Sequence, residues 1–240
     1  MMARLGHFIF HYRTVLSPLL LLLLLIPGPH LTADPFLAAV LGLVVALTGQ
    51  VVRAATIGLD YIVRGGRNKR VYADALVTEG LFRHTRNPMY VGKFLMVAGA
   101  GVAANSWPAL VAICAAYSFM YHAVVLAEEE YLRQKFGATF DEYCRLTPRW
   151  LPRVRGLRAT FADSAFDWVR VITKEYSAPL GWTLPIVAIG LYNMSRIADA
   201  DQSPVKQAFL IVVASAAAIL WLTAGWLKKS GGLARRSTSA

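Results

Sequence analysis

The sequence is poor in charged residues, and this shortage limits the kind of protein it encodes. Only 16% of its 240 residues are Asp, Glu, Lys or Arg, whereas soluble domains carry about 25%. Hydrophobic residues make up 56% of the chain, and its mean hydropathy is +0.46. So few charges cannot cover so much apolar surface, which excludes an ordinary water-soluble domain and predicts a protein that uses a membrane as its solvent.

Several catalytic and structural signals are also missing. The only cysteines are Cys114 and Cys144, which excludes a disulfide framework. The sequence has no Gly-rich phosphate loop and no Gly-x-Ser-x-Gly elbow, so nucleophilic hydrolase chemistry has no support. His7 and His11 have the i, i+4 spacing of metal ligands, but no third ligand lies near them. We therefore expect no metal site.

Acidic residues are the scarcer charge type, and the formal net charge is +11. The basic residues do not form a separate stripe interleaved with aromatic residues, so nucleic acid is not expected as a partner. They fall instead in the stretches between long apolar runs. That distribution is typical of the orientation signal of membrane proteins.

Six apolar runs are candidates for membrane-spanning helices, which need about 17–25 residues. They predict an all-α integral membrane protein with about six spans. The runs are Phe8–Ile26, Phe36–Val52, Tyr90–Ala104, Trp107–Ala127, Ala178–Met194 and Ala208–Leu227.

Only Asn105-Ser106 joins the third and fourth runs, so these helices are predicted to form an antiparallel pair. With six spans, all of the 25 Lys and Arg residues except Arg196 and Lys206 fall on one side. The positive-inside rule places that side, with both termini, in the cytoplasm, and in a bacterium the membrane would be the inner one. The first run also resembles a signal peptide, but no small-x-small cleavage site follows Pro27, so we expect a span.

Two stretches between the fourth and fifth runs have the pattern of amphipathic helices at the membrane interface. In the first, Leu132, Phe136, Phe140 and Tyr143 recur at helical spacing. The second is Thr160–Ile172, with Thr160 and Asp163 as a capping box. The basic residues between them are predicted to meet anionic lipid headgroups, or to be a solvated orienting cluster. They are Arg149, Arg153, Arg155 and Arg158.

A polar segment immediately before the third run has features of an anion site. Pro88 suits the first turn of a helix, and Asn87 is then a candidate N-cap. The free amides of that turn are suited to a carboxylate or phosphate. Gly92 and Gly99 allow close approach either of another helix or of a flat ring.

Three consecutive carboxylates, Glu128, Glu129 and Glu130, follow the fourth run directly. On a helix they point about 100° apart, so one or two of them can face a given pocket. They are either solvated where the helix leaves the membrane or turned inward toward a cation. Arg83 and Arg86 are the candidate partners.

These pieces form an ordered series over about residues 70–153 that resembles the isoprenylcysteine carboxyl methyltransferase family and its phospholipid methyltransferase relatives. The series is Leu76-Val77-Thr78-x-Gly80, Arg86-Asn87-Pro88-Met89-Tyr90-x-Gly92, Asn105, Glu128-Glu129-x-x-Leu132-x-x-x-Phe136-Gly137, Tyr143 and Pro148.

The resemblance implies S-adenosyl-L-methionine as cofactor, held at the cytoplasmic membrane face, and a lipophilic acceptor that arrives from the bilayer. Glu129 would face a positive part of the cofactor, and Tyr90 and Phe82 would offer aromatic faces. The implied cofactor-binding residues are Asp74, Ala75, Leu76, Val77, Phe82, Arg86, Asn87, Pro88, Met89, Tyr90 and Glu129. The candidate catalytic residues are Glu128, Tyr90, His84 and Tyr143.

Two departures from the family pattern bear on the substrate. Asn87 stands where many members have His, and an amide cannot titrate near neutral pH, which excludes a general base at this position. Val125 stands where eukaryotic protein-carboxyl members have an arginine for the substrate carboxylate. The departure leaves the acceptor open between a phospholipid amine, an isoprenoid carboxylate, a thiol and a quinone-like hydroxyl.

The expected organisation is residues 1–60 for the N-terminal helices, 61–158 for the methyltransferase core and 159–240 for the interfacial helix and the last pair of spans. That pair would wall the lipid entrance or form a homodimer interface. The alternative functions are a membrane oxidoreductase resembling sterol reductases and a non-catalytic membrane scaffold.

Overall fold

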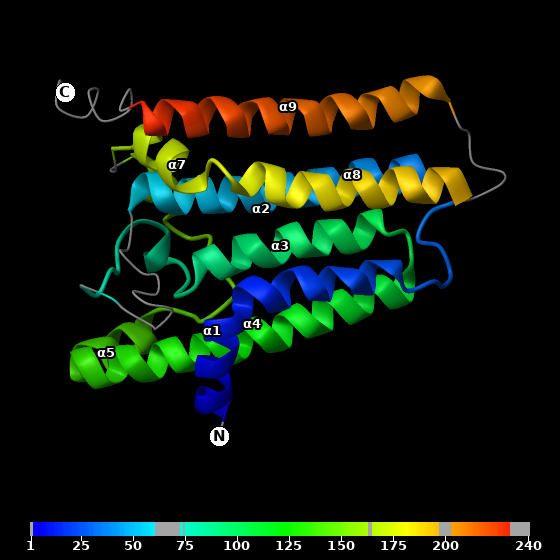
Figure 1. Cartoon of the computed structure of the whole chain (residues 1–240). Coiled ribbons are helices and arrows are strands. Elements are labelled where there is room, and N and C mark those ends of the chain that lie inside the picture. Colours follow the sequence, from blue (N-terminus) through cyan, green and yellow to red (C-terminus); the bar gives the residue numbers. More distant parts are fainter. Residues whose placement is uncertain (1, 61–72, 74, 163–164, 197–202, 231–240) are drawn as a thin grey trace.

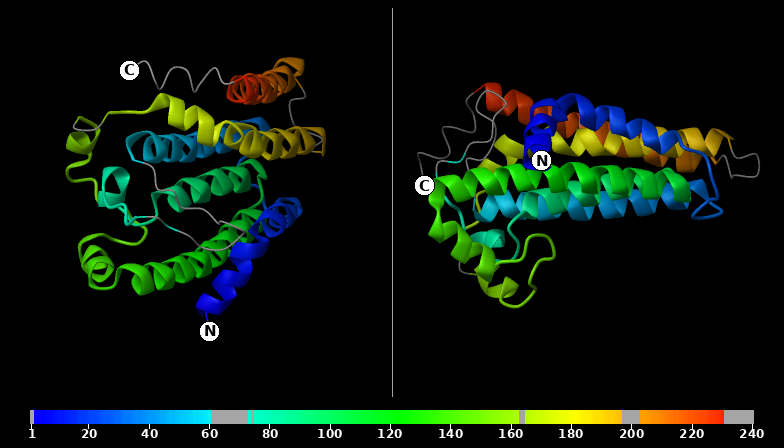
Figure 2. Two further views of the ribbon diagram at one scale, coloured as in Figure 1. Left: turned by 60° about the vertical axis from the view of Figure 1, so that its left-hand side comes forward. Right: turned by 90° about the horizontal axis from the view of Figure 1, so that it is seen from below.

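The computed structural model describes residues 2–60, 73, 75–162, 165–196 and 203–230, and their regular secondary structure is entirely helical. The expectation of an all-α protein is confirmed for these residues. Six long helices form a bundle in which they lie side by side, except that the N-terminal part of α1 points away from it (Figures 1 and 2). They are α1 Met2–Leu20, α2 Pro35–Leu59, α3 Pro88–Ala103, α4 Trp107–Phe136, α8 Ala178–Arg196 and α9 Pro204–Lys229.

Four helical segments are long and apolar enough to cross a membrane: Leu5–Leu25, which combines most of α1 with the 3-10 helix η1 (Leu21–Leu25), then α2, α4 and α9. Helix α3 is apolar but has only 16 residues. Large apolar side chains also cover the outer surface of α9, where Val212, Leu220 and Trp226 are all more than half exposed. Such surfaces suit contact with lipid.

The starts of the helices follow the punctuation in the sequence. Asp34 caps α2 by accepting a hydrogen bond from the Phe36 amide at 2.9 Å, and Pro35 occupies the first turn. Ser106 caps α4 in the same way through the Ala109 amide. Asn87 stands at the N-cap position of α3, as expected, although its side chain makes no capping hydrogen bond.

A seam of glycines holds α2 against α3. A Cβ atom built on Gly42 would lie 2.4 Å from the Gly99 carbonyl oxygen, and one built on Gly49 would lie 2.4 Å from the Gly92 carbonyl oxygen. Since Gly42 meets Gly99 and Gly49 meets Gly92, the helices are antiparallel and their backbones nearly touch. Helix packing is therefore the role of Gly92 and Gly99 that the structure supports.

The turn between α3 and α4 is tied to the loop between α1 and α2. Asn105 has a positive φ of 52°, and its side-chain oxygen accepts hydrogen bonds from the amides of Leu31 and Thr32 at 3.1 and 3.0 Å. The Ser106 hydroxyl donates to the Ile26 carbonyl oxygen at 2.8 Å. The predicted hairpin is confirmed, and it brings the start of α3 and the carboxylates of α4 to the opposite end of the bundle.

That opposite end carries shorter elements (Figure 1): the 3-10 helix η2 (Gly80–Arg83) and the helices α5 (Ala138–Leu146), α6 (Leu157–Ala162) and α7 (Trp168–Glu175). Two details of the expected interfacial helices were wrong. Gly137, with φ of +53°, separates Phe136 from Phe140, so the first stretch is the end of α4 followed by α5.

The second expected helix, Thr160–Ile172, is two helices instead of one. Thr160 lies inside α6, and Asp163 lies outside the described residues. Helix α7 is capped by Asp167, whose side chain accepts from the Arg170 amide at 2.8 Å. The proposed capping box is therefore wrong, because a different aspartate begins the second helix.

Candidate functional site

Two segments distant in the sequence run side by side at the motif end of the bundle. The Arg86 amide donates to the Pro148 carbonyl oxygen at 2.9 Å, and the Arg153 amide donates to the His84 carbonyl oxygen at 3.0 Å. The Thr85 hydroxyl lies 3.1 Å from the Trp150 carbonyl oxygen, to which it donates. The stretch before α3 and the stretch after α5 therefore form one unit, as expected if the two motif halves share a site.

Glu129 is the centre of a buried ionic cluster in this unit. Its Oε1 atom accepts hydrogen bonds from Arg86 Nη1 at 2.9 Å and from Arg149 Nε at 3.0 Å, and its Oε2 atom accepts from Arg149 Nη2 at 2.7 Å. The Glu129 side chain is only 7% exposed. The hydrogen bonds to Glu129 raise the pKa of Arg149 above its ordinary value, so its guanidinium stays charged.

The two candidate arginine partners behave differently. Arg86 does pair with Glu129, and its Nη1 atom also lies 2.8 Å from Cys144 Sγ. Arg83 instead forms an exposed ion pair with Glu79 at 2.8 Å, so it is not a partner of the carboxylate triplet. Burial raises the pKa of the Cys144 thiol, although Arg86 lowers it in part, which keeps this cysteine protonated at neutral pH.

Arg149 is the partner that the sequence did not reveal. It belongs to a series of arginines with no helical periodicity, and its neighbours Arg153, Arg155 and Arg158 are exposed. The one available signal was its position directly after Pro148, the last residue of the motif series.

Tyr90 and Glu128 form a second contact between the motif halves. The Tyr90 hydroxyl donates a hydrogen bond to Glu128 Oε1 at 2.7 Å, and Glu128 is 8% exposed. Because Glu128 and Glu129 are neighbours on α4, one carboxylate faces Tyr90 while the other faces the two arginines. Glu130, by contrast, is half exposed and lies 3.8 Å from His7.

Two other candidate catalytic residues are hydrogen-bonded to protein groups. His84 is buried, and its Nδ1 and Nε2 atoms lie 2.6 Å from the Arg153 carbonyl oxygen and 2.9 Å from the Thr160 hydroxyl. The Tyr143 hydroxyl donates to the Phe82 carbonyl oxygen at 2.7 Å. In this geometry both side chains join neighbouring loops and helices.

The remaining candidate cofactor residues are distributed around this unit. Asn87 is buried and donates from Nδ2 to the Arg149 carbonyl oxygen at 3.1 Å. Phe82 and Pro88 are buried, and Leu76 packs against an apolar cluster that includes Phe140. Met89 and Val77 are partly exposed, Ala75 is exposed, and Asp74 lies outside the described residues.

A buried ion pair beneath the start of α3 was also missed. Arg53 on α2 binds Glu175 on α7 through two nitrogens, and its Nη1 atom lies 3.3 Å from the Met89 carbonyl oxygen, to which it donates. Both side chains are at most 10% exposed. The pair fixes α7 against α2 and supports the first turn of α3, but residues 122 positions apart offer no pairing signal in the sequence.

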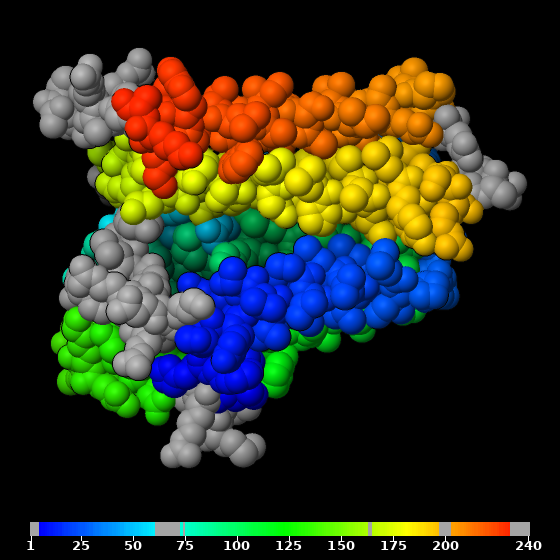
Figure 3. Space-filling model, viewed as in Figure 1, coloured from blue at the N-terminus to red at the C-terminus, as the bar shows by residue number. Residues whose placement is uncertain are grey.

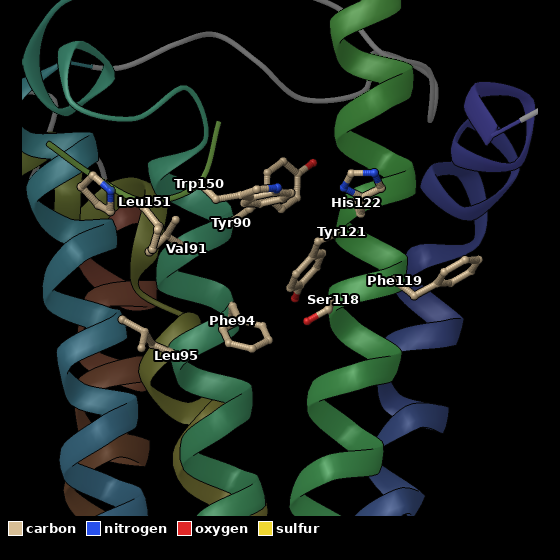
Figure 4. Close-up of a pocket in the computed structure, with 11 residues that line it drawn as sticks. Tyr90, Val91, Phe94, Leu95, Ser118, Phe119, Tyr121, His122, Trp150 and Leu151 are labelled. Atoms are coloured by element: carbon tan, nitrogen blue, oxygen red, sulfur yellow. The ribbon is translucent and has the colours of Figure 1, made fainter. Parts of the chain in front are cut away.

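An apolar pocket of about 630 Å³ opens beside Tyr90 (Figure 4). Helix α3 contributes Phe94 to it, helix α4 contributes Tyr121 and His122, and the loop after α5 contributes Trp150. The ring centroids of Tyr90 and Tyr121 are 5.3 Å apart. A space of this size and character suits a hydrocarbon chain better than a charged ligand.

Comparisons with known proteins find relatives for the middle of the chain. Residues 37–139 match the family described as phospholipid methyltransferase. The protein-S-isoprenylcysteine O-methyltransferase of Xenopus laevis is 30% identical over 126 residues, which are 50% of this chain and 42% of that protein. No solved structure matches.

Two further relatives are named for metal resistance. The nickel-cobalt-cadmium resistance protein NccN of Alcaligenes xylosoxydans xylosoxydans is 32% identical over 150 residues, 62% of this chain and 66% of that protein. The cobalt-zinc-cadmium resistance protein CzcN of Cupriavidus metallidurans is 35% identical over 81 residues, 34% of this chain and 37% of that protein. The chain thus spans about two thirds of NccN and under half of the other two relatives.

The apolar helices indicate an integral membrane protein, and these matches show that its central part is similar to membrane methyltransferases. More particularly, its residues 37–139 resemble the phospholipid methyltransferase family, and its isoprenylcysteine carboxyl methyltransferase relatives resemble it over 40–50% of the chain.

Proposed function

We propose that this protein transfers a methyl group from S-adenosyl-L-methionine to a lipophilic acceptor at the cytoplasmic face of a membrane. One observation supports this above the others. The α3–α4 hairpin brings Arg86 and Tyr90 into contact with Glu129 and Glu128 beside an apolar pocket of about 630 Å³. A reaction between a charged cofactor and a lipid requires a polar binding site next to an apolar pocket, and these contacts lie next to one.

The residues of the ionic cluster fit the methionine part of the cofactor. Arg86, Arg149 and Glu129 together carry two positive charges and one negative charge, and the buried Arg86 Nε has no hydrogen-bond partner among the described residues. A carboxylate is the natural complement of that excess. Glu129 accepts three hydrogen bonds and has capacity for about one more, which an ammonium group would use.

The cofactor would supply a methyl group activated by attachment to a sulfonium. The protein's own task is then to align donor and acceptor and to exclude water. The Tyr90 ring lines the apolar pocket and offers a face to a cation. Glu128, next to Tyr90, is the group positioned to take a proton from an amine acceptor, whereas His84 and Tyr143 act by holding the loops in place.

The acceptor is proposed to be isoprenoid, phospholipid or similar. Relatives named for an isoprenylcysteine substrate support the first class, and the phospholipid methyltransferase match supports the second.

For topology we propose six spans with both termini in the cytoplasm, in the inner membrane if the source is bacterial. Length and hydropathy identify four spans, and helices α3 and α8 would be the other two. Arg196 at the end of α8 and Lys206 on α9, bonded to Asp34, belong to the opposite end. The exposed arginines after Pro148 would face anionic headgroups. Helix α9 would form a wall of a lipid entrance or the interface of a homodimer.

Labelled S-adenosyl-L-methionine binding to the purified protein in detergent, with NADPH as a competitor, tests the proposal. We expect saturable binding that NADPH does not displace and that Glu129→Gln weakens at least ten-fold. The matched control is Glu130→Gln, because this neighbouring carboxylate is half exposed and should leave binding unchanged. Binding of NADPH alone would favour the oxidoreductase, and binding of neither would favour a scaffold.

A further inference from the structure

The loop between α5 and α6, residues 147–156, has two edges of different character. On its inner edge Arg149 binds Glu129, and Trp150 lines the apolar pocket (Figure 4). On its outer edge Leu151 and Val154 are 84% and 80% exposed, more than any other large hydrophobic side chain that the structure describes. Two such apolar side chains close together in one loop indicate contact with another apolar phase.

Cations alternate with these apolar residues. Arg153 and Arg155 belong to the loop and Arg158 to the first turn of α6, and all three are exposed. Residues 143–162 contain no Asp or Glu, and no salt bridge joins the three arginines to a carboxylate elsewhere in the described part of the chain. A boundary between anionic headgroups and acyl chains would complement both kinds of side chain, whereas a soluble anion would complement only the arginines.

The position of the loop along the bundle suits a membrane surface. Asn87, directly before α3, donates from Nδ2 to the Arg149 carbonyl oxygen at 3.1 Å. The loop is therefore level with the start of an apolar helix, and the pocket beside it opens among side chains of α3 and α4. Under the proposed topology this is the level of the cytoplasmic headgroups, where amphipathic segments lie with their apolar side chains at the acyl boundary.

Hydrogen bonds connect the outer edge of the loop to the inner one. The Arg153 amide donates to the His84 carbonyl oxygen at 3.0 Å, and the Arg153 carbonyl oxygen lies 2.6 Å from His84 Nδ1. The Thr85 hydroxyl donates to the Trp150 carbonyl oxygen at 3.1 Å. Because both edges are fixed to the same short segment before α3, a partner that binds the outer edge in this conformation also stabilises the inner edge.

We propose that the α5–α6 loop and the first turn of α6 form a docking site for an anionic membrane surface, and that docking regulates cofactor binding. The headgroups bind the three exposed arginines while Leu151 and Val154 enter the acyl layer, and the docked loop holds Arg149 against Glu129. This inference rests on the proposed function, because Glu129 belongs to the proposed cofactor site. Coupling between two sites is reciprocal, so anionic lipid raises the affinity for the cofactor, and the cofactor favours insertion of the loop.

The first test measures S-adenosyl-L-methionine binding to the full chain in nanodiscs of phosphatidylcholine with and without phosphatidylglycerol. We expect binding about five-fold or more tighter when phosphatidylglycerol is present, which is the lower end of typical coupling between two sites. The double variant Arg155→Gln/Arg158→Gln should lose most of this increase, because both side chains are exposed and lie outside the ionic cluster.

A matched control is needed because a cationic cofactor is itself concentrated near an anionic bilayer, whatever the loop does. The double variant Arg145→Gln/Lys229→Gln removes the same charge from two other exposed positions. Helix α5 and the end of α9, which carry them, lie at the same end of the bundle (Figures 1 and 3). The control should retain the increase that phosphatidylglycerol causes.

The second test measures insertion directly. Val154→Cys is labelled with a fluorophore in a background with Cys114 and Cys144 replaced by Ser. Lipids that carry a spin label on the acyl chain should quench this fluorophore, and addition of phosphatidylglycerol or S-adenosyl-L-methionine should increase the quenching. Arg155→Gln/Arg158→Gln in the same background should abolish the increase that phosphatidylglycerol causes.

The two readouts allow this inference and the proposed function to fail separately. Equal cofactor affinity in both bilayers, an equal increase in the two double variants, or a label at position 154 that is not quenched would overturn the docking site. The same increase from soluble glycerol phosphate in neutral nanodiscs would overturn it as well, since a bilayer surface would then not be needed. Absence of cofactor binding in every bilayer would remove the proposed function, and with it the regulation, even if the label were quenched.

Discussion

Arg149 binds Glu129 through two parallel hydrogen bonds, one from Nε at 3.0 Å and one from Nη2 at 2.7 Å. The two residues are only 20 positions apart, yet one follows α5 and the other lies within α4. A guanidinium in this orientation fixes both the position and the plane of the carboxylate. The loop that carries Trp150 into the apolar pocket is thus attached directly to the ionic cluster.

The first prediction concerns the shape of that contact. Arg149→Lys keeps the positive charge but cannot make two parallel bonds to Glu129. We expect the affinity for S-adenosyl-L-methionine to fall about ten-fold, corresponding to roughly 1.4 kcal/mol, and Arg149→Gln to cause a larger loss. Isothermal titration in detergent measures both. Arg145→Lys is the control on an exposed position, and equal affinities for all variants would contradict the assigned role.

The second prediction separates the ring of Tyr90 from its hydroxyl. Tyr90→Phe removes the hydrogen bond to Glu128 and should lower stability by about 1 kcal/mol. Because the ring remains, cofactor affinity should stay within about two- to three-fold of wild type, whereas Tyr90→Ala should lose ten-fold or more. Thermal unfolding and cofactor titration report the two effects. An equal loss in both variants would show that the hydroxyl, not the ring, contacts the cofactor.

The third prediction tests the glycine seam. Gly49→Ala places a methyl group 2.4 Å from a backbone oxygen of α3, which cannot move aside as a side chain can. The expected loss of stability is about 1–3 kcal/mol. Gly181→Ala is the matched control, since a Cβ at that position meets nothing within 4 Å. The control should be neutral or slightly stabilising because alanine favours a helix by about 1 kcal/mol.

The fourth prediction tests the proposed topology with thiol labelling. In a background with Cys114 and Cys144 replaced by Ser, Ser195→Cys at the end of α8 should react with a membrane-impermeant maleimide on intact cells. Arg145→Cys on α5 should react only after permeabilisation. Both positions are exposed in the structure, so a difference reports the membrane side. Labelling of both from outside would rule out an arrangement with the site facing the cytoplasm.

Much of the helical framework was predictable because it depends on local signals. Runs of apolar residues located all six long helices, and Pro88 marked the start of α3. Their status as spans is a different question, since length and hydropathy select only four. The short helices were less predictable: apolar spacing continues through Gly137, but its left-handed backbone ends α4.

The site was predictable only where the motif series named its residues. Arg83 and Arg86 were the candidate partners of the three glutamates, and one of them, Arg86, pairs with Glu129. Arg149 and the Arg53–Glu175 pair depend on contacts between distant segments, for which a single sequence carries no pattern. His84 shows the opposite error, in which the sequence suggests a catalytic role for a residue that the structure places in hydrogen bonds between loops. A histidine in a polar motif suggested catalysis, yet both of its ring nitrogens are within hydrogen-bond distance of loop groups, which only the folded geometry reveals.

Tyr90 and Tyr121 line both the apolar pocket and a second cavity of about 310 Å³ that Arg13 and Lys93 also line. The two spaces therefore share these aromatic side chains as part of their walls. A ligand that displaces either tyrosine ring from one cavity would therefore change the shape of the other cavity as well.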